Sequence, residues 1–242
     1  IYGKDNVTYV RNFTDVDDKI NDRAKEKKVT INEITEETIK WFHEDMDQLE
    51  ALRPTSEPRA TQYISQMITM IVELISKSYA YPTNDGHVFF SVEKFDDYGK
   101  LSNKDLDELL TGSRIENQES KTNPLDFVLW KPSSSEEPGW DSPWGFGRPG
   151  WHIECSAMSR DLLGEHFDIH GGGIDLIFPH HENEIAQSVC ASTSKNFANF
   201  WLHNGYLMLE DEKMSKSLNN FITVKELIEN DFSGQAIRYV MF

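Results

Sequence analysis

Residues 168–187 read DIHGGGIDLIFPHHENEIAQ. Three glycines lead into a hydrophobic run, and two histidines and two glutamates then occupy four of the five positions 180–184. Glycine lets a backbone approach a bound nucleotide closely, and histidine and glutamate are common metal ligands. If a helix begins after Pro179, His180 and Glu184 share one face, because side chains four residues apart are neighbours on a helix. The stretch therefore predicts a metal site beside a phosphate or nucleotide site.

The segments around this stretch alternate between strand-like and helix-like patterns. Apolar spacing from Ile34 to Leu49 predicts an amphipathic helix, and a second apolar stripe predicts another. In the last hundred residues the alternation fits a parallel α/β sheet, whereas residues 21–125 resemble a mixed insertion. The expected strands are 7–10, 87–92, 126–131 and 200–209, and the expected helices are 30–52, 61–78 and one from about residue 224.

Composition restricts the class of protein. A chain of 242 residues can form one large domain or two small ones. No stretch approaches the roughly 20 apolar residues that span a bilayer, and no membrane partner is expected. The two cysteines, Cys155 and Cys190, are too few for a disulfide framework, which favours a reducing cytoplasm. A net charge of −17 argues against general nucleic-acid binding but permits a local basic patch.

The loop EKMSKSLNN, residues 212–220, is the second chemical motif. Lys213 and Lys216 are three positions apart, and Ser215 and Ser217 add hydroxyl groups. Two ammonium groups on a loop can close over a polyphosphate and offset the charge that develops on a leaving pyrophosphate. A bare pair of lysines at this spacing is usually an exposed loop, but the full string KMSKS is much more specific.

These motifs together resemble a known family. KMSKS resembles the signature loop of class I aminoacyl-tRNA synthetases, and the chain as a whole is similar to cysteinyl-tRNA synthetase. The segments that carry the likeness are RNFTDVDDKI (11–20), NPLDFVLWK (123–131), GRPGWHIECSAM (147–158), FDIHGGGIDLIFPHHENEIAQS (167–188) and EKMSKSLNNF (212–221).

The resemblance implies a fold and a domain division. We expect an α/β architecture: a Rossmann-type, parallel-sheet, nucleotide-binding catalytic domain formed by residues 1–20 and 126–242. Residues 21–125 would be a mixed α/β insertion, the connective peptide. The HIGH motif of the family would lie before Ile1 and its tRNA-binding domain after Phe242, so we expect the chain as it stands to have little or no activity.

The resemblance also implies a zinc site. Its ligands here would be Cys155, His180 and Glu184, and a fourth cysteine would precede Ile1. His181 and Glu182 would be neighbours of the site and not ligands. Zinc binds a soft thiolate well, so the site would select the substrate cysteine over serine without editing. Cys190 is expected in the core.

Further roles carry over from the family to single residues. Thr14, Trp151 and His170 match positions around the amino-acid pocket. His170, Gly172, Asp175 and Lys216 would contact ATP, with Asp175 accepting from a ribose hydroxyl. Lys213 and Lys216 would be catalytic.

The expected function is ATP-dependent activation of cysteine to cysteinyl-adenylate and its transfer to tRNA(Cys). The substrates would be L-cysteine, ATP with Mg²⁺, and tRNA(Cys), and the protein would be a monomer. Two alternatives stay open: the ligase that joins cysteine to an amino sugar in mycothiol synthesis, and a non-catalytic synthetase-like binding module. A zinc protease fits poorly, since HHENE is not H-E-x-x-H.

Overall fold

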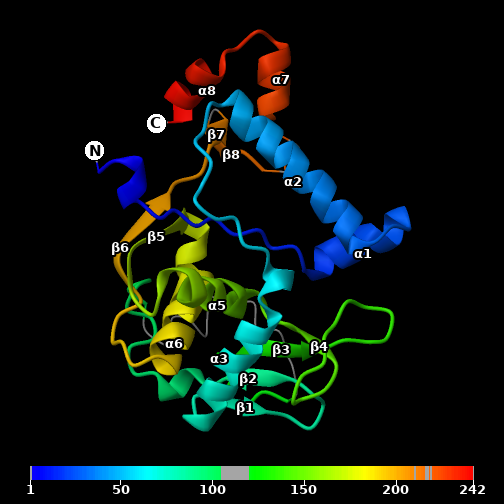
Figure 1. Cartoon of the computed structure of the whole chain (residues 1–242), viewed down its shortest axis with the longest axis vertical. Helices are drawn as coiled ribbons and strands as arrows, with labels where there is room; N and C mark the ends of the chain where they lie inside the picture. Colours follow the sequence, from blue (N-terminus) through cyan, green and yellow to red (C-terminus); the bar gives the residue numbers. More distant parts are fainter. Residues whose placement is uncertain (1, 105–119, 210, 216–217, 219, 242) are drawn as a thin grey trace.

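The computed structural model describes residues 2–104, 120–209, 211–215, 218 and 220–241. Figure 1 shows α2 and α7 side by side at one end of the molecule, and α3, α5 and α6 gathered at the other. The helices are α1 (Asp18–Lys27), α2 (Ile31–Gln48), α3 (Ile64–Ser76), α5 (Trp151–Leu163), α6 (Glu182–Ala191), α7 (Val224–Glu229) and α8 (Gly234–Met241). The strands are β1 (Ala80–Pro82), β2 (Val88–Phe90), β3 (Phe127–Pro132), β4 (Gly147–Pro149), β5 (Phe167–Gly173), β6 (Ala198–Asn204), β7 (Met208–Leu209) and β8 (Glu212–Lys213).

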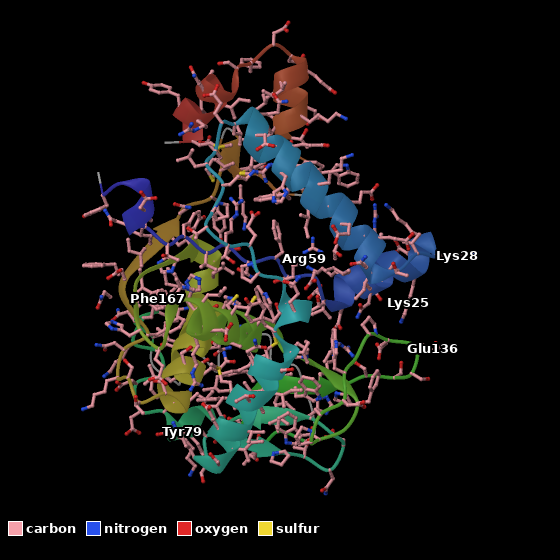
Figure 2. All side chains as sticks on the ribbon, in the orientation of Figure 1. Lys25, Lys28, Arg59, Tyr79, Glu136 and Phe167 are labelled. Carbon is pink, nitrogen blue, oxygen red and sulfur yellow. The ribbon has the colours of Figure 1, made fainter. Side chains whose placement is uncertain are left out.

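Capping side chains fix the residues at which α1 and α2 begin. The Asp17 side chain accepts from the Lys19 amide at the start of α1, and Thr30 and Glu33 form a reciprocal capping box at the start of α2. The helix predicted at 30–52 is therefore confirmed, but it ends at Gln48. Trp41, one of the residues that give the apolar spacing between Ile34 and Leu49, is nevertheless 52% exposed. Figure 2 shows Lys25 and Lys28 at the α1 end of this pair of helices.

The core lies between α3, α5, α6 and an antiparallel sheet. The predicted stripe of α3 is confirmed, since Met67, Ile71 and Leu74 are fully buried against the sheet and the two later helices. The sheet has the order β1-β2-β3-β4, and all of its neighbouring strands are antiparallel.

This sheet crosses the expected domain division. Strands β1 and β2 belong to the expected insertion, whereas β3 and β4 belong to the part assigned to the catalytic domain. The division at residues 125 and 126 stays a prediction, but one sheet joins the two sides of it.

The parallel element is the pair β5–β6. Its register runs from Phe167 opposite Ala198 to Gly173 opposite Asn204, and α6 lies between the two strands in the chain. This β-α-β crossover is the unit from which parallel sheets are built. The sequence predicted one strand-like stretch over 200–209, but β6 ends at Asn204 and a short antiparallel hairpin, β7–β8, follows Gly205.

Two local predictions were wrong. Residues 7–10 form no regular strand; Tyr9, Arg11 and Phe13 bond to residues 55–60, with isolated bridges at Val10 and Phe13. Val7 and Tyr9 are each 49% exposed, so no apolar layer extends this pairing into a sheet. The C-terminal helix expected from about residue 224 begins at Val224, but it ends at Glu229 and α8 follows it, because Asp231 adopts a left-handed φ of 64° between the two.

No helix in the described part of the chain has both the length and the apolar character needed to cross a membrane.

Candidate active site

The N-terminal turns of α5 and α6 carry the chemical groups, and backbone contacts fix where these helices begin. A Cβ on Gly150, the residue before α5, would lie 2.2 Å from the Val128 carbonyl oxygen, so only glycine permits this approach to β3. The chain enters α6 through a turn at Ile177–His181, in which Phe178 has extended dihedrals. Cys155 on α5 and His180 and Glu184 at the start of α6 therefore face the same space.

Glu184 lies at the centre of this space. Its side chain is fully buried, with Oε1 2.9 Å from His180 Nε2 and Oε2 2.6 Å from His170 Nε2. Each oxygen is thus paired with an imidazole nitrogen, although neither contact has regular hydrogen-bond geometry. Burial opposes ionisation, but His170 and His180 hold the pKa of this carboxyl well below its usual range. Burial of a carboxylate is costly unless it is paired, and a bound cation would stabilise it beyond what the two imidazoles supply.

The three expected zinc ligands lie together. Cys155, His180 and Glu184 each offer a ligand atom within 4.8 Å of the others. Burial raises the pKa of the Cys155 thiol well above its usual value, and the nearby Glu184 and Glu154 carboxylates raise it further. This thiol would ionise only with a cation beside it. Sulfur, imidazole and carboxylate donors are a set that suits Zn²⁺, so the residues present fit the metal.

Aromatic rings surround His180. Its Nδ1 lies 2.9 Å from Nδ1 of His152, and its ring centroid lies 4.4 Å from that of Trp151. Burial, followed by the His180 charge, lowers the pKa of His152 to about 3, so His152 is neutral and can fix the orientation of the His180 ring. Sequence reasoning missed His152. Its position three residues before Cys155, on the same helix face, was the available signal.

A second set of side chains lies on the other side of Glu184. Ligand atoms of His170, His181 and Glu184 also lie within 4.8 Å of one another. Nδ1 of His181 is 2.8 Å from Nε2 of His203, a residue of β6 that sequence reasoning missed. His203 is the β6 partner of Gly172 in the strand register. The position of His203 beside His181 thus depends on the pairing of β5 with β6, which is not evident from the sequence alone.

Glu182 is engaged elsewhere. Its two carboxylate oxygens accept from the backbone amides of Gly99 and Ser102, each at 2.9 Å. These bonds attach the 99–102 loop to α6, and they occupy both oxygens of a side chain that is 1% exposed.

Thr14 and Trp151, expected at the amino-acid pocket, both lie close to the α5 end of the cluster. The Thr14 hydroxyl donates to Glu154 Oε2 at 3.1 Å, and Glu154 precedes Cys155. Thr14 also lines a cavity of about 340 Å³ between residues 11–15 and α2. Trp151 is 48% exposed, so one part of its ring contacts His180 while another faces solvent.

The residues expected to contact ATP lie in different surroundings. Gly172 lies against His181, and a Cβ there would be 3.0 Å from its Nε2. Asp175 is exposed just beyond the glycines. Lys213 is exposed on β8, with its ammonium group 3.5 Å from the Tyr206 ring centroid. Lys216 falls outside the described residues.

Comparison with known proteins gives the family. Residues 2–242 match the family model described as tRNA synthetases class I (C) catalytic domain. The chain therefore belongs to this family, and the resemblance and the α/β, Rossmann-type fold expected from the sequence are confirmed.

Curated relatives carry one name. The chain is 61% identical over 241 residues to a cysteine–tRNA ligase of Ruegeria pomeroyi, covering 99% of this chain and 52% of that protein. It is 61% identical over 235 residues to the cysteine–tRNA ligase of Rhodospirillum rubrum, covering 97% and 51%. The chain thus spans about half the length of these relatives. A solved Campylobacter jejuni structure described as an arginyl-tRNA synthetase shares the fold, with a TM-score of 0.51 and 12% identity over 87% of this chain and 38% of the other.

Proposed function

We propose that this chain supplies the catalytic domain of a cysteine–tRNA ligase, which activates cysteine with ATP and transfers it to tRNA(Cys). The observation that carries the proposal is the cluster of Cys155, His180 and Glu184, whose ligand atoms lie within 4.8 Å of one another beside a fully buried carboxylate. The named relatives favour this function over an amino-sugar ligase or a binding module. We further propose that the protein is a cytoplasmic monomer, a location that its two unpaired cysteines fit.

Selection of the amino acid would depend on the zinc ligands. Zinc held by Cys155, His180 and Glu184 would supply a soft Lewis acid that favours the thiolate of cysteine over the hydroxyl of serine. A small difference in side-chain size is worth only about 1–3 kcal/mol in an apolar pocket. Size alone would therefore separate cysteine from competing amino acids poorly.

The surrounding residues would hold the rest of the substrate. The exposed part of the Trp151 ring can pack on the amino acid beside His180. Thr14 has its proton directed at Glu154, so its lone pairs can accept from the substrate ammonium group. His170, at the end of β5 and 2.6 Å from Glu184, would limit the far side of the pocket.

The phosphate chemistry would depend on the loop after β8. ATP with Mg²⁺ would lie along the glycines 171–173, with Asp175 accepting from its ribose. Lys213 and Lys216 would neutralise charge on the departing pyrophosphate, a contribution that is largest in the transition state.

Cysteine-dependent ATP–pyrophosphate exchange, measured in a full-length context, tests this proposal, and the sequence has a matched control in its second cysteine. Cys155→Ala should lower kcat/KM for cysteine by about 100-fold or more, because the thiolate loses a metal-held binding site. Cys190→Ala, a change in the core, should leave it nearly unchanged. Equal exchange rates in the Cys155→Ala and Cys190→Ala proteins would contradict the assignment. Charging of tRNA(Cys) transcripts then tests the transfer step.

A further inference from the structure

The two oxygens of Glu184 point to two different groups of side chains. Oε1 lies 2.9 Å from His180 Nε2, on the side of Cys155. Oε2 lies 2.6 Å from His170 Nε2, on the side of His181. The Glu184 carboxylate therefore connects the two groups, and each oxygen can bind a cation that replaces the proton shared with its histidine. The zinc of the proposed function takes the Cys155 side only.

The two adjacent histidines are held in matching ways. Nδ1 of His180 lies 2.9 Å from a nitrogen of His152, and Nδ1 of His181 lies 2.8 Å from a nitrogen of His203. A metal-binding imidazole usually has its second nitrogen hydrogen-bonded, because that bond fixes the tautomer and the ring orientation. With Nδ1 engaged, Nε2 is the nitrogen of each ring that can bind a metal; that of His180 lies 2.9 Å from Glu184 Oε1. His181 therefore has the same preparation for metal binding as His180.

Gly172 leaves space beside the available nitrogen of His181. A Cβ at Gly172 would lie 3.0 Å from His181 Nε2 and 3.0 Å from Cε1. An alanine would thus press on the face at which a ligand would approach. The strand register sets Gly172 opposite His203, so the space and the supporting histidine come from one pair of neighbouring residues.

We propose that His170, His181 and Glu184 form a second divalent-cation position, which shares the Glu184 carboxylate with the Cys155–His180 position. Two imidazoles and one carboxylate are a donor set used by zinc sites. The second position is the weaker one, because it lacks a thiolate and because two dications would then face only two anionic ligands, Cys155 and Glu184. This position goes beyond the proposed function, which requires one zinc ion besides the Mg²⁺ that accompanies ATP.

Titration of the purified, metal-stripped chain with Co²⁺ distinguishes the two positions. Thiolate-bound Co²⁺ has an intense near-ultraviolet charge-transfer band, whereas imidazole and carboxylate ligands give only weak visible bands. The first equivalent should produce the charge-transfer band, and a second, about tenfold weaker or more, should add visible absorption alone. His181→Gln should abolish the second phase and keep the first, which also shows that this variant folds. Cys155→Ala should abolish the charge-transfer band and keep the weaker phase.

His166→Gln is the matched control, since His166 is exposed and contacts Asn199; both phases should persist in it. Binding of a single equivalent by the unmodified chain, or a second phase that survives His181→Gln, would overturn the proposal. Loss of both phases together in His181→Gln and in His170→Asn would also overturn it, because the histidines would then serve one site. A missing charge-transfer band in the unmodified chain counts against the Cys155 assignment instead, and the visible phase still reports the second position.

Discussion

The cluster between α5 and α6 and the loop after β8 carry the two halves of the proposed chemistry, and they are built in opposite ways. Glu184 and His180 are 0% and 6% exposed in their side chains, and each contacts a neighbouring ring. Lys213 is exposed, and its contact is with Tyr206 in the segment before β7.

The difference follows from what each region must bind. A site that separates a thiol from a hydroxyl gains from a low dielectric and from ligands fixed in advance, since both strengthen the interaction with a soft ligand. A site that neutralises pyrophosphate must admit a large, hydrated anion and release it. We therefore expect substitutions in the loop to affect reaction rate, and substitutions around the cluster to affect metal binding and stability.

The largest expected effect is in the loop. In a full-length context, Lys216→Ala should slow adenylate formation by about 100- to 1000-fold, because its charge acts mainly on the departing pyrophosphate. Cysteine affinity should hardly change. Single-turnover kinetics and equilibrium cysteine binding measure the two quantities separately.

Lys225→Ala removes an exposed lysine from α7 and serves as the control for overall charge. If Lys216→Ala weakened cysteine binding and left the chemical step intact, the division of labour between loop and cluster would be wrong.

The next effect lies beside the cluster. Gly172→Ala would introduce a methyl group 2.9 Å from Leu176 Cδ1 and 3.0 Å from two atoms of the His181 ring. Such overpacking typically costs about 1–3 kcal/mol in the free energy of unfolding, and here it would also displace His181 from His203. Urea unfolding measures the cost.

Gly205→Ala is the matched control, because a Cβ there meets no described atom within 4 Å. Its effect should stay within about 0.5 kcal/mol. Similar losses in both variants would show that the cluster is less tightly packed than its contacts indicate.

The smallest effect concerns Cys190, a buried thiol outside the cluster. Burial raises the pKa of Cys190 to about 12, so the folded chain keeps this proton while the unfolded chain loses it above a pH of about 8.5. Ionisation of Cys190 therefore does not affect the free energy of unfolding below about pH 8.5. Above that pH, the free energy of unfolding falls by about 1.4 kcal/mol per pH unit as the pH rises toward 12.

Unfolding of the unmodified chain and of Cys190→Ala at pH 8 and pH 10 isolates this contribution from that of Cys155. The stability difference between the two proteins should shrink by about 1–2 kcal/mol at the higher pH. A pH-independent difference would contradict the burial argument for Cys190.

Much of the cluster could be predicted from sequence because it depends on local spacing. His180, in the turn that enters α6, and Glu184 of α6 are four residues apart and contact each other, as the sequence indicated. Cys190 was expected in the core and is 5% exposed there. The apolar stripe of α3 could also be predicted, since helical periodicity is evident within a short stretch of sequence.

The features that the sequence did not reveal depend on non-local pairing. His203 reaches His181 only because β6 lies parallel to β5 in one register. The sheet β1-β2-β3-β4 joins segments on both sides of the expected domain boundary, and no local pattern reports such pairing. Residues 7–10 have strand-forming side chains, but this segment pairs with only one neighbouring segment among the described residues. Val7 and Tyr9 are also left largely exposed, so no regular strand forms.

The central claim is that Cys155, His180 and Glu184 hold zinc. X-ray absorption at the zinc edge, measured on the purified chain loaded with less than one equivalent, tests it most directly. We predict one sulfur ligand at about 2.3 Å together with nitrogen or oxygen ligands at about 2.0–2.2 Å, and loss of the sulfur in Cys155→Ala but not in Cys190→Ala. A spectrum without sulfur, or a sulfur that persists in Cys155→Ala, would contradict the account.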